Sequence, residues 1–176
     1  DFAVQNNMSM LPIPTAVGGR YSIFTPIGLL PLALLGAKVD DFVHGAKDID
    51  TACQSEQLDG NPAAQLAAVQ YLLDTKRNIP VRVIMPYTQK LESLARWNQQ
   101  LIAESLGKVE TPNPIPLAAI GTQDQHSLLQ QWMEGPRKQW HLFIRVENLT
   151  TITVPEDVDS HFIYIAGKPF GELLDE

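Results

Sequence analysis

Three short apolar segments constrain the fold more than any other feature of this sequence. They are VRVIMPY at 81–87, PIPLAAIG at 114–121 and KQWHLFIRVE at 138–147. Each is too short for a typical helix and rich in large apolar residues, a pattern typical of a buried strand in a parallel sheet. Helical patterns at about 89–107 and 125–134 separate the three segments. The alternation predicts an α/β domain with parallel strands and right-handed crossovers.

The segment before the first strand predicts helices with recognisable start signals. We expect helices over about 26–36, 39–57 and 62–78. Thr25-Pro26 and Asn61-Pro62 each read as a capping residue followed by the first helical position. We expect the helix at 26–36 to be buried. Residues 1–19 are polar and then proline-rich, so they predict an extended entry segment.

Composition excludes several classes of partner. The 176 residues suffice for one domain with a core, and 44% hydrophobic residues argue against disorder. A net charge of −7 without a basic block makes nucleic acid and anionic membranes poor partners. The longest apolar run, 27–37, is too short to cross a bilayer and contains Pro31. A lone cysteine, Cys53, fits a reducing compartment, so we expect a cytoplasmic protein.

The first candidate site residue is Arg20, which follows Gly18-Gly19. A glycine pair marks a place where the backbone turns tightly or lets another group come close. Arginine presents a planar fork of donors suited to oxygen anions. Arg20 is therefore either a surface residue beside a turn or a cation aimed at an anionic ligand or intermediate.

The second candidate is Glu104, in QQLIAESLGK near the end of a predicted helix. Gln100 lies one turn earlier, so the two side chains share a helix face. The pair is either part of a solvated polar surface, or a carboxylate base beside an amide that binds the same ligand.

The third candidate is His126, just past the second predicted strand and at the start of a helix. Ligands of open parallel sheets bind beyond the carboxyl ends of the strands, and histidine exchanges protons near neutral pH. His126 is either structural or an acid–base group. The other histidines have no metal-ligand spacing with another His or Cys, so we assign no metal site.

Four segments, taken together, resemble the glucose-6-phosphate isomerase family. They are VGGRYSIFTPIGLLPLALLG, DGNPAAQLA, QQLIAESLGK and GTQDQHSLLQQWMEGP, which occur in the family's order at plausible spacing. The main departure is Thr15, where the family more often has an acidic or small residue. The resemblance implies a three-layer α/β/α sandwich of the flavodoxin-like kind, the sugar-isomerase (SIS) domain. It assigns 1–24 to an entry segment with the Gly-Gly-Arg loop and 25–176 to the second SIS domain, truncated at its C-terminus.

The resemblance also implies an activity and roles for the candidate residues. The family interconverts glucose 6-phosphate and fructose 6-phosphate in glycolysis and gluconeogenesis, without metal or organic cofactor. Glu104 would move the proton between carbons 2 and 1, and Arg20 would stabilise the enediolate. His126 would assist ring opening, while Gly19 and Gln100 would contact the substrate.

Features that the family needs are absent from this sequence. The phosphate-binding Ser/Thr-rich loop belongs to the first SIS domain, and no Phe-Asp-Gln-x-Gly-Val-Glu signature is present. The family works as a homodimer in which the histidine reaches the neighbouring subunit's site. We therefore expect this piece alone to have little or no activity. Two alternatives stay open: a non-catalytic SIS module that binds a sugar phosphate, and an isomerase that also accepts mannose 6-phosphate.

Overall fold

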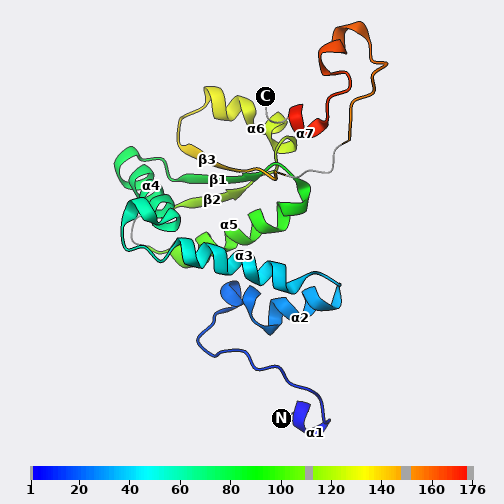
Figure 1. Ribbon diagram of the computed structural model, residues 1–176. Helices are drawn as coiled ribbons and strands as arrows, with labels where there is room; N and C mark the ends of the chain where they lie inside the picture. The colour runs from blue at the N-terminus through cyan, green and yellow to red at the C-terminus, as the bar shows by residue number, and fades with distance from the viewer. Residues whose placement is uncertain (1, 110–112, 148–151, 174–176) are drawn as a thin grey trace.

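A parallel sheet of three strands forms the centre of the molecule (Figure 1). The computed structural model describes residues 2–109, 113–147 and 152–173. Strands β1 (Val81–Pro86), β2 (Ile115–Ala118) and β3 (Gln139–Ile144) lie in the order β2-β1-β3, and both pairings are parallel. The predicted α/β class is confirmed. The second and third strands are shorter than predicted, because only the central residues of each apolar segment pair with β1.

Helices cover both faces of this sheet. Helix α5 (Glu92–Leu106) lies on one face and α6 (Gln123–Glu134) on the other (Figure 1). Successive side chains of β1 point to opposite faces of the sheet. Val83 and Met85 are fully buried in a core that includes Trp132 of α6. The predicted three-layer α/β/α arrangement is confirmed.

A buried ion pair fastens α4 (Pro62–Arg77) to the central strand. Arg82 interrupts the apolar pattern of β1, and its guanidinium bonds Asp74 of α4. A second donor, Nη1, bonds Gln70 Oε1 at 2.8 Å. The side chains of Arg82 and Asp74 are only 10% and 4% exposed. Polar contacts therefore position this helix on the sheet.

The N-terminal part differs from the prediction in three respects, the first being that Phe2–Gln5, inside the expected extended segment, form a short helix. It contains α1 (Phe2–Gln5), the 3₁₀ turn η1 (Gly19–Phe24), α2 (Pro26–Leu34), α3 (Val39–Ala52) and the 3₁₀ turn η2 (Leu58–Gly60). The predicted burial of the helix at 26–36 is wrong: no residue of α2 is buried, because it packs mainly on η1 and α3. The helix predicted to reach residue 57 ends at Ala52. There the Ser55 hydroxyl accepts a bond from the Gln57 amide and stabilises a turn instead.

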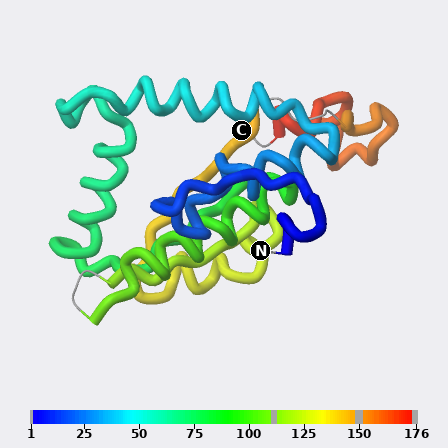
Figure 2. Tube along the Cα trace, turned by 90° about the horizontal axis from the view of Figure 1, so that it is seen from below, coloured from blue at the N-terminus to red at the C-terminus, as the bar shows by residue number. Residues whose placement is uncertain are grey.

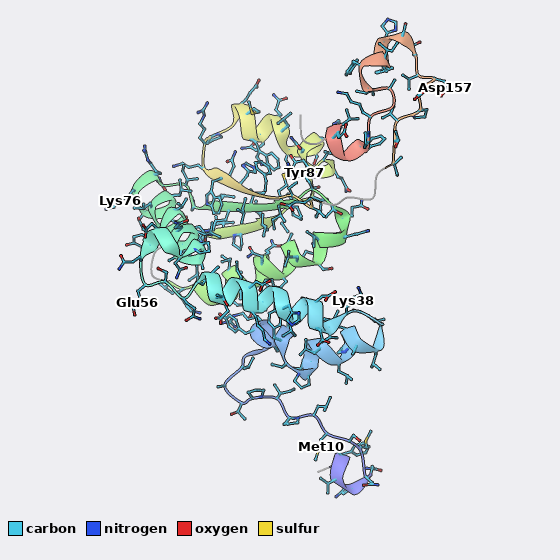
Figure 3. All side chains as sticks on the ribbon, in the orientation of Figure 1. Met10, Lys38, Glu56, Lys76, Tyr87 and Asp157 are labelled. Atoms are coloured by element: carbon cyan, nitrogen blue, oxygen red, sulfur yellow. The ribbon has the colours of Figure 1, made fainter. Side chains whose placement is uncertain are left out.

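Both predicted helix starts are confirmed. Thr25 Oγ1 accepts a bond from the Ile27 amide at 3.3 Å, and Asn61 Oδ1 accepts one from the Ala64 amide at 2.9 Å. These caps set where α2 and α4 begin. Figure 2 shows α3 and α4 as long helices that meet at a corner of the molecule. The entry segment around Met10 runs away from this body (Figure 3).

The C-terminal residues 152–173 project from the sheet (Figures 1 and 2). This segment holds the 3₁₀ turn η4 (Ser160–Ile165) and the short α7 (Phe170–Leu173), and a bridge joins Thr153 to Pro169. Residues 174–176, which follow α7, lie outside the described ranges. Among the described helices, none combines the length and apolar character needed to cross a bilayer.

Candidate functional site

The 3₁₀ turn η1 brings Arg20 onto the C-terminal half of α5. The Ser22 hydroxyl closes the turn by donating to the Gly19 carbonyl at 2.6 Å. Trp97, from α5, donates its indole N–H to the Arg20 carbonyl at 2.9 Å. The backbone of Arg20 is thus fixed both within its own turn and against the helix that carries Glu104.

Arg20, Glu104 and Gln100 form one hydrogen-bonded group. Arg20 Nη1 lies 3.2 Å from Glu104 Oε2, and Gln100 Nε2 donates to Glu104 Oε1 at 2.9 Å. Each carboxylate oxygen therefore has its own donor, which fixes the plane of the carboxylate. The side chains of Arg20 and Glu104 are 28% and 50% exposed, so a ligand in solution can reach both. The structure brings together three of the residues singled out from the sequence.

Two further residues of this group were missed by the sequence analysis. Ser105 Oγ accepts a bond from Arg20 Nε at 3.0 Å and lies 2.9 Å from the Tyr21 hydroxyl. The Arg20 guanidinium carbon lies 4.9 Å from the centre of the Tyr21 ring, a cation–π geometry. The hydrogen bonds from Ser105 and then Arg20 lower the pKa of the Tyr21 hydroxyl. The available signal was adjacency, since Tyr21 follows Arg20 and Ser105 follows Glu104.

The glycines near Arg20 have different surroundings from those expected. Gly18 has φ −70° and extended backbone, which any residue can adopt, so no tight turn requires it. A Cβ on Gly19 would meet no atom within 4 Å, so the space beside it is open. Gly28 is the crowded position, because a Cβ there would lie 2.1 Å from the Ile23 carbonyl oxygen. Sequence reasoning passed over Gly28, which lets α2 pack against η1.

His126 is not brought to the group around Glu104 within this chain. It lies in the first turn of α6, beyond β2 as predicted, and its side chain is exposed. Helix α6, however, occupies the face of the sheet opposite to α5 (Figure 1). Within the described ranges, no hydrogen bond or ion pair joins the His126 ring to another side chain.

The loop before His126 is nevertheless well ordered by contacts. Asp124 Oδ2 accepts a bond from the Ile120 amide at 2.6 Å, and the Tyr87 hydroxyl donates to Gln125 Oε1 at 2.9 Å. Tyr87 lies at the end of the sheet, just after β1 (Figure 3). A Cβ on Gly121 would lie 2.8 Å from its ring. These contacts fix where α6 begins, and with it the position of His126.

Comparisons with known proteins assign the chain to a family. The family model described as phosphoglucose isomerase matches residues 1–159. The glucose-6-phosphate isomerase of Methanocaldococcus jannaschii is 43% identical over 77% of this chain and 33% of its own length. That of Rubrobacter xylanophilus is 39% identical over 98% of this chain and 40% of its own length.

Solved structures share the fold. A hypothetical protein from Thermus thermophilus superposes with a TM-score of 0.83 at 33% identity, over 98% of this chain and 42% of that protein. A glucose-6-phosphate isomerase from Chlamydia trachomatis gives a TM-score of 0.75 at 22% identity, over 93% of this chain and 32% of that protein. The chain thus spans less than half the length of each relative. Because the family model covers most of its residues, the chain belongs to the phosphoglucose isomerase family.

Proposed function

We propose that this chain supplies part of the active site of a glucose-6-phosphate isomerase, which interconverts glucose 6-phosphate and fructose 6-phosphate. The observation that carries the proposal is the group formed by Arg20, Glu104 and Gln100 in a member of this family. An ordered, half-exposed carboxylate beside a fixed cation suits proton abstraction next to a carbonyl. Such a reaction needs a base for the proton and a positive charge for the oxygen.

In the proposed mechanism, Glu104 removes the proton from carbon 2 of the open-chain sugar. The electron pair of that C–H bond forms the carbon–carbon double bond of a cis-enediolate, whose negative charge develops on oxygen. Arg20 stabilises this charge, while Gln100 keeps the carboxylate oriented. Glu104 then returns the proton to carbon 1, while the proton on oxygen 2 passes to oxygen 1, so that carbon 2 becomes the carbonyl of fructose 6-phosphate. All of these steps use side chains of the protein, and none requires a metal or an organic cofactor.

Substrate binding requires the direct contact between Arg20 and Glu104 to open. Glu104 Oε2, which would accept the proton, and Arg20 Nη1, which would bind the substrate oxygen, lie 3.2 Å apart and are each other's partners. We propose that a substrate oxygen replaces Oε2 as the partner of Nη1, which frees Oε2 to accept the carbon-bound proton. Gln100 still holds the other carboxylate oxygen during this exchange. The open space beside Gly19 is where the sugar would approach.

The remaining assignments are proposals of the same kind. Residues 25–176 form the SIS domain and 1–24 its entry segment. The complete enzyme is a cytoplasmic homodimer, and His126 assists ring opening in the neighbouring subunit's site. The position of His126 across the sheet from α5 supports this assignment to another site.

The test is an isomerase assay of the full-length gene product beside its Glu104→Gln variant. This change keeps the shape of the side chain and removes the base. We expect kcat to fall by about a thousandfold or more, comparable to the loss of a positioned acid–base group. Glu134→Gln, on α6, makes the same chemical change away from the site and should leave kcat unchanged.

A folded parent that does not isomerise glucose 6-phosphate would contradict the proposal. If it still binds the sugar phosphate in a calorimetric titration, the alternative of a non-catalytic SIS module is supported. A non-catalytic module has no use for a base, so its affinity should survive the Glu104→Gln change.

A further inference from the structure

The Arg20 guanidinium is held by one edge and open at the other. Its Nε donates to Ser105 Oγ at 3.0 Å, whereas Nη1 faces Glu104. These two contacts use Nε and Nη1, and Nη2 takes part in neither of them. We propose that Ser105 is a positioning residue for the isomerisation. By engaging Nε, it turns the Nη1–Nη2 edge of Arg20 toward Glu104 and the oxygen of the intermediate.

The contacts around Ser105 fix the geometry of its hydrogen bond with Arg20. Ser105 lies next to Glu104 on α5, so the serine and the base move as one rigid unit. Its hydroxyl accepts from Arg20 and shares a second hydrogen bond with the Tyr21 hydroxyl, which fixes the direction of its lone pairs. Tyr21 also places its ring under the guanidinium. Because Arg20 and Tyr21 are neighbours in η1, both ends of the contact have a fixed backbone.

Without the serine hydroxyl, the guanidinium can rotate about its last side-chain bonds. Trp97 would still hold the Arg20 carbonyl, and Tyr21 would still lie against the guanidinium. The charge would remain in the site, but its donors would no longer point in one direction. Electrostatic stabilisation depends on donors that are already aimed at the developing charge. Loss of the hydroxyl should therefore affect the chemical step more than substrate binding.

This inference rests on the proposed function and is tested in the full-length gene product. We expect Ser105→Ala to lower kcat roughly ten- to hundredfold, the scale of a small misplacement in an active site. KM should change little. Ser105→Thr restores the hydroxyl and should recover most of kcat. Ser93→Ala removes an exposed serine from the same helix and should behave like the parent.

A double-mutant cycle separates positioning from a general structural role. If Ser105 acts through Arg20, then Ser105→Ala should cause no further loss in an Arg20→Ala background. Additive losses, or an unaffected kcat in Ser105→Ala, would overturn the inference while leaving the isomerase proposal intact. An inactive but folded parent would overturn the proposed function and this inference with it. Far-UV circular dichroism checks that each variant folds.

Discussion

Gly19 and Gly28 lie in the same segment, VGGRYSIFTPIG, but have opposite surroundings in the structure. Gly19 borders open space, whereas the position of a Cβ on Gly28 is occupied by the carbonyl of Ile23. The Ile23 carbonyl belongs to backbone and cannot swing away as a side chain would. Gly28 is therefore needed for the close approach of α2 to η1, and η1 carries Arg20.

We expect Gly28→Ala to lower the free energy of unfolding by about 1–3 kcal/mol, the usual cost of overpacking. Gly19→Ala should stay within about 0.5 kcal/mol of the parent, since its methyl group enters open space. The same Gly19 variant should lower isomerase activity if substrate approaches there. Urea unfolding followed by tryptophan fluorescence, with a parallel activity assay, compares the two variants. A Gly28→Ala protein as stable as the parent would show that η1 can move away from α2.

At the scale of elements, α4 is joined to the sheet by an ion pair rather than by a continuous apolar face. Asp74 and Arg82 are both nearly covered, and Gln70 supplies a further acceptor. Burial makes each charge dependent on its partner, because an isolated charge in a protein interior is costly. Replacing one partner should therefore lower the free energy of unfolding more than replacing both.

We expect Asp74→Ala to destabilise the protein by about 3–5 kcal/mol, because it leaves Arg82 buried and unpaired. The double variant Asp74→Leu with Arg82→Met should regain most of that loss, since two apolar side chains can replace a buried pair. Asp48→Ala, on the exposed side of α3, serves as the control. Thermal unfolding of the three variants measures the difference. Equal losses in the single and double variants would contradict this account of α4.

The elements themselves could largely be predicted from the sequence, because their signals are local. Strands β1 to β3 follow from short apolar segments, and the starts of α2 and α4 from their capping residues. The bond from Arg20 Nε to Ser105 could not be predicted, because it joins residues 85 positions apart. The burial of α2 was mispredicted because an apolar helix does not reveal which partner covers it.

At the scale of the whole molecule, the candidate residues divide between two sides of the sheet. Arg20 contacts Glu104 of α5, whereas His126 lies in the first turn of α6, on the opposite face of the sheet (Figure 1). The chain also leaves apolar surface exposed, including a cavity of about 520 Å³ between α6 and β3. Since the chain spans 40% of a relative such as the Rubrobacter xylanophilus enzyme, further polypeptide is available in that relative to cover such surfaces.

Because Glu104 and His126 lie on opposite faces of the sheet, an experiment can show whether one active site takes these residues from one subunit or from two. If Glu104 and His126 serve one site from different subunits, two impaired variants, Glu104→Gln and His126→Ala, should complement each other. In a mixed dimer, one site carries both changes and the other carries none. Random reassociation makes about half of the dimers mixed, so about a quarter of the parent's activity should return.

The measurement is the isomerase rate of the two full-length variants after joint dissociation and reassociation. Each variant treated alone is the control and should stay impaired. No recovery in verified mixed dimers would mean that both residues serve the same subunit's site. In that case a rearrangement would have to bring α6 around the sheet, which the contacts of Tyr87 and Asp124 at its start oppose. Complementation would instead explain why Glu104 and His126 are each held firmly and yet lie on opposite faces of the sheet within one chain.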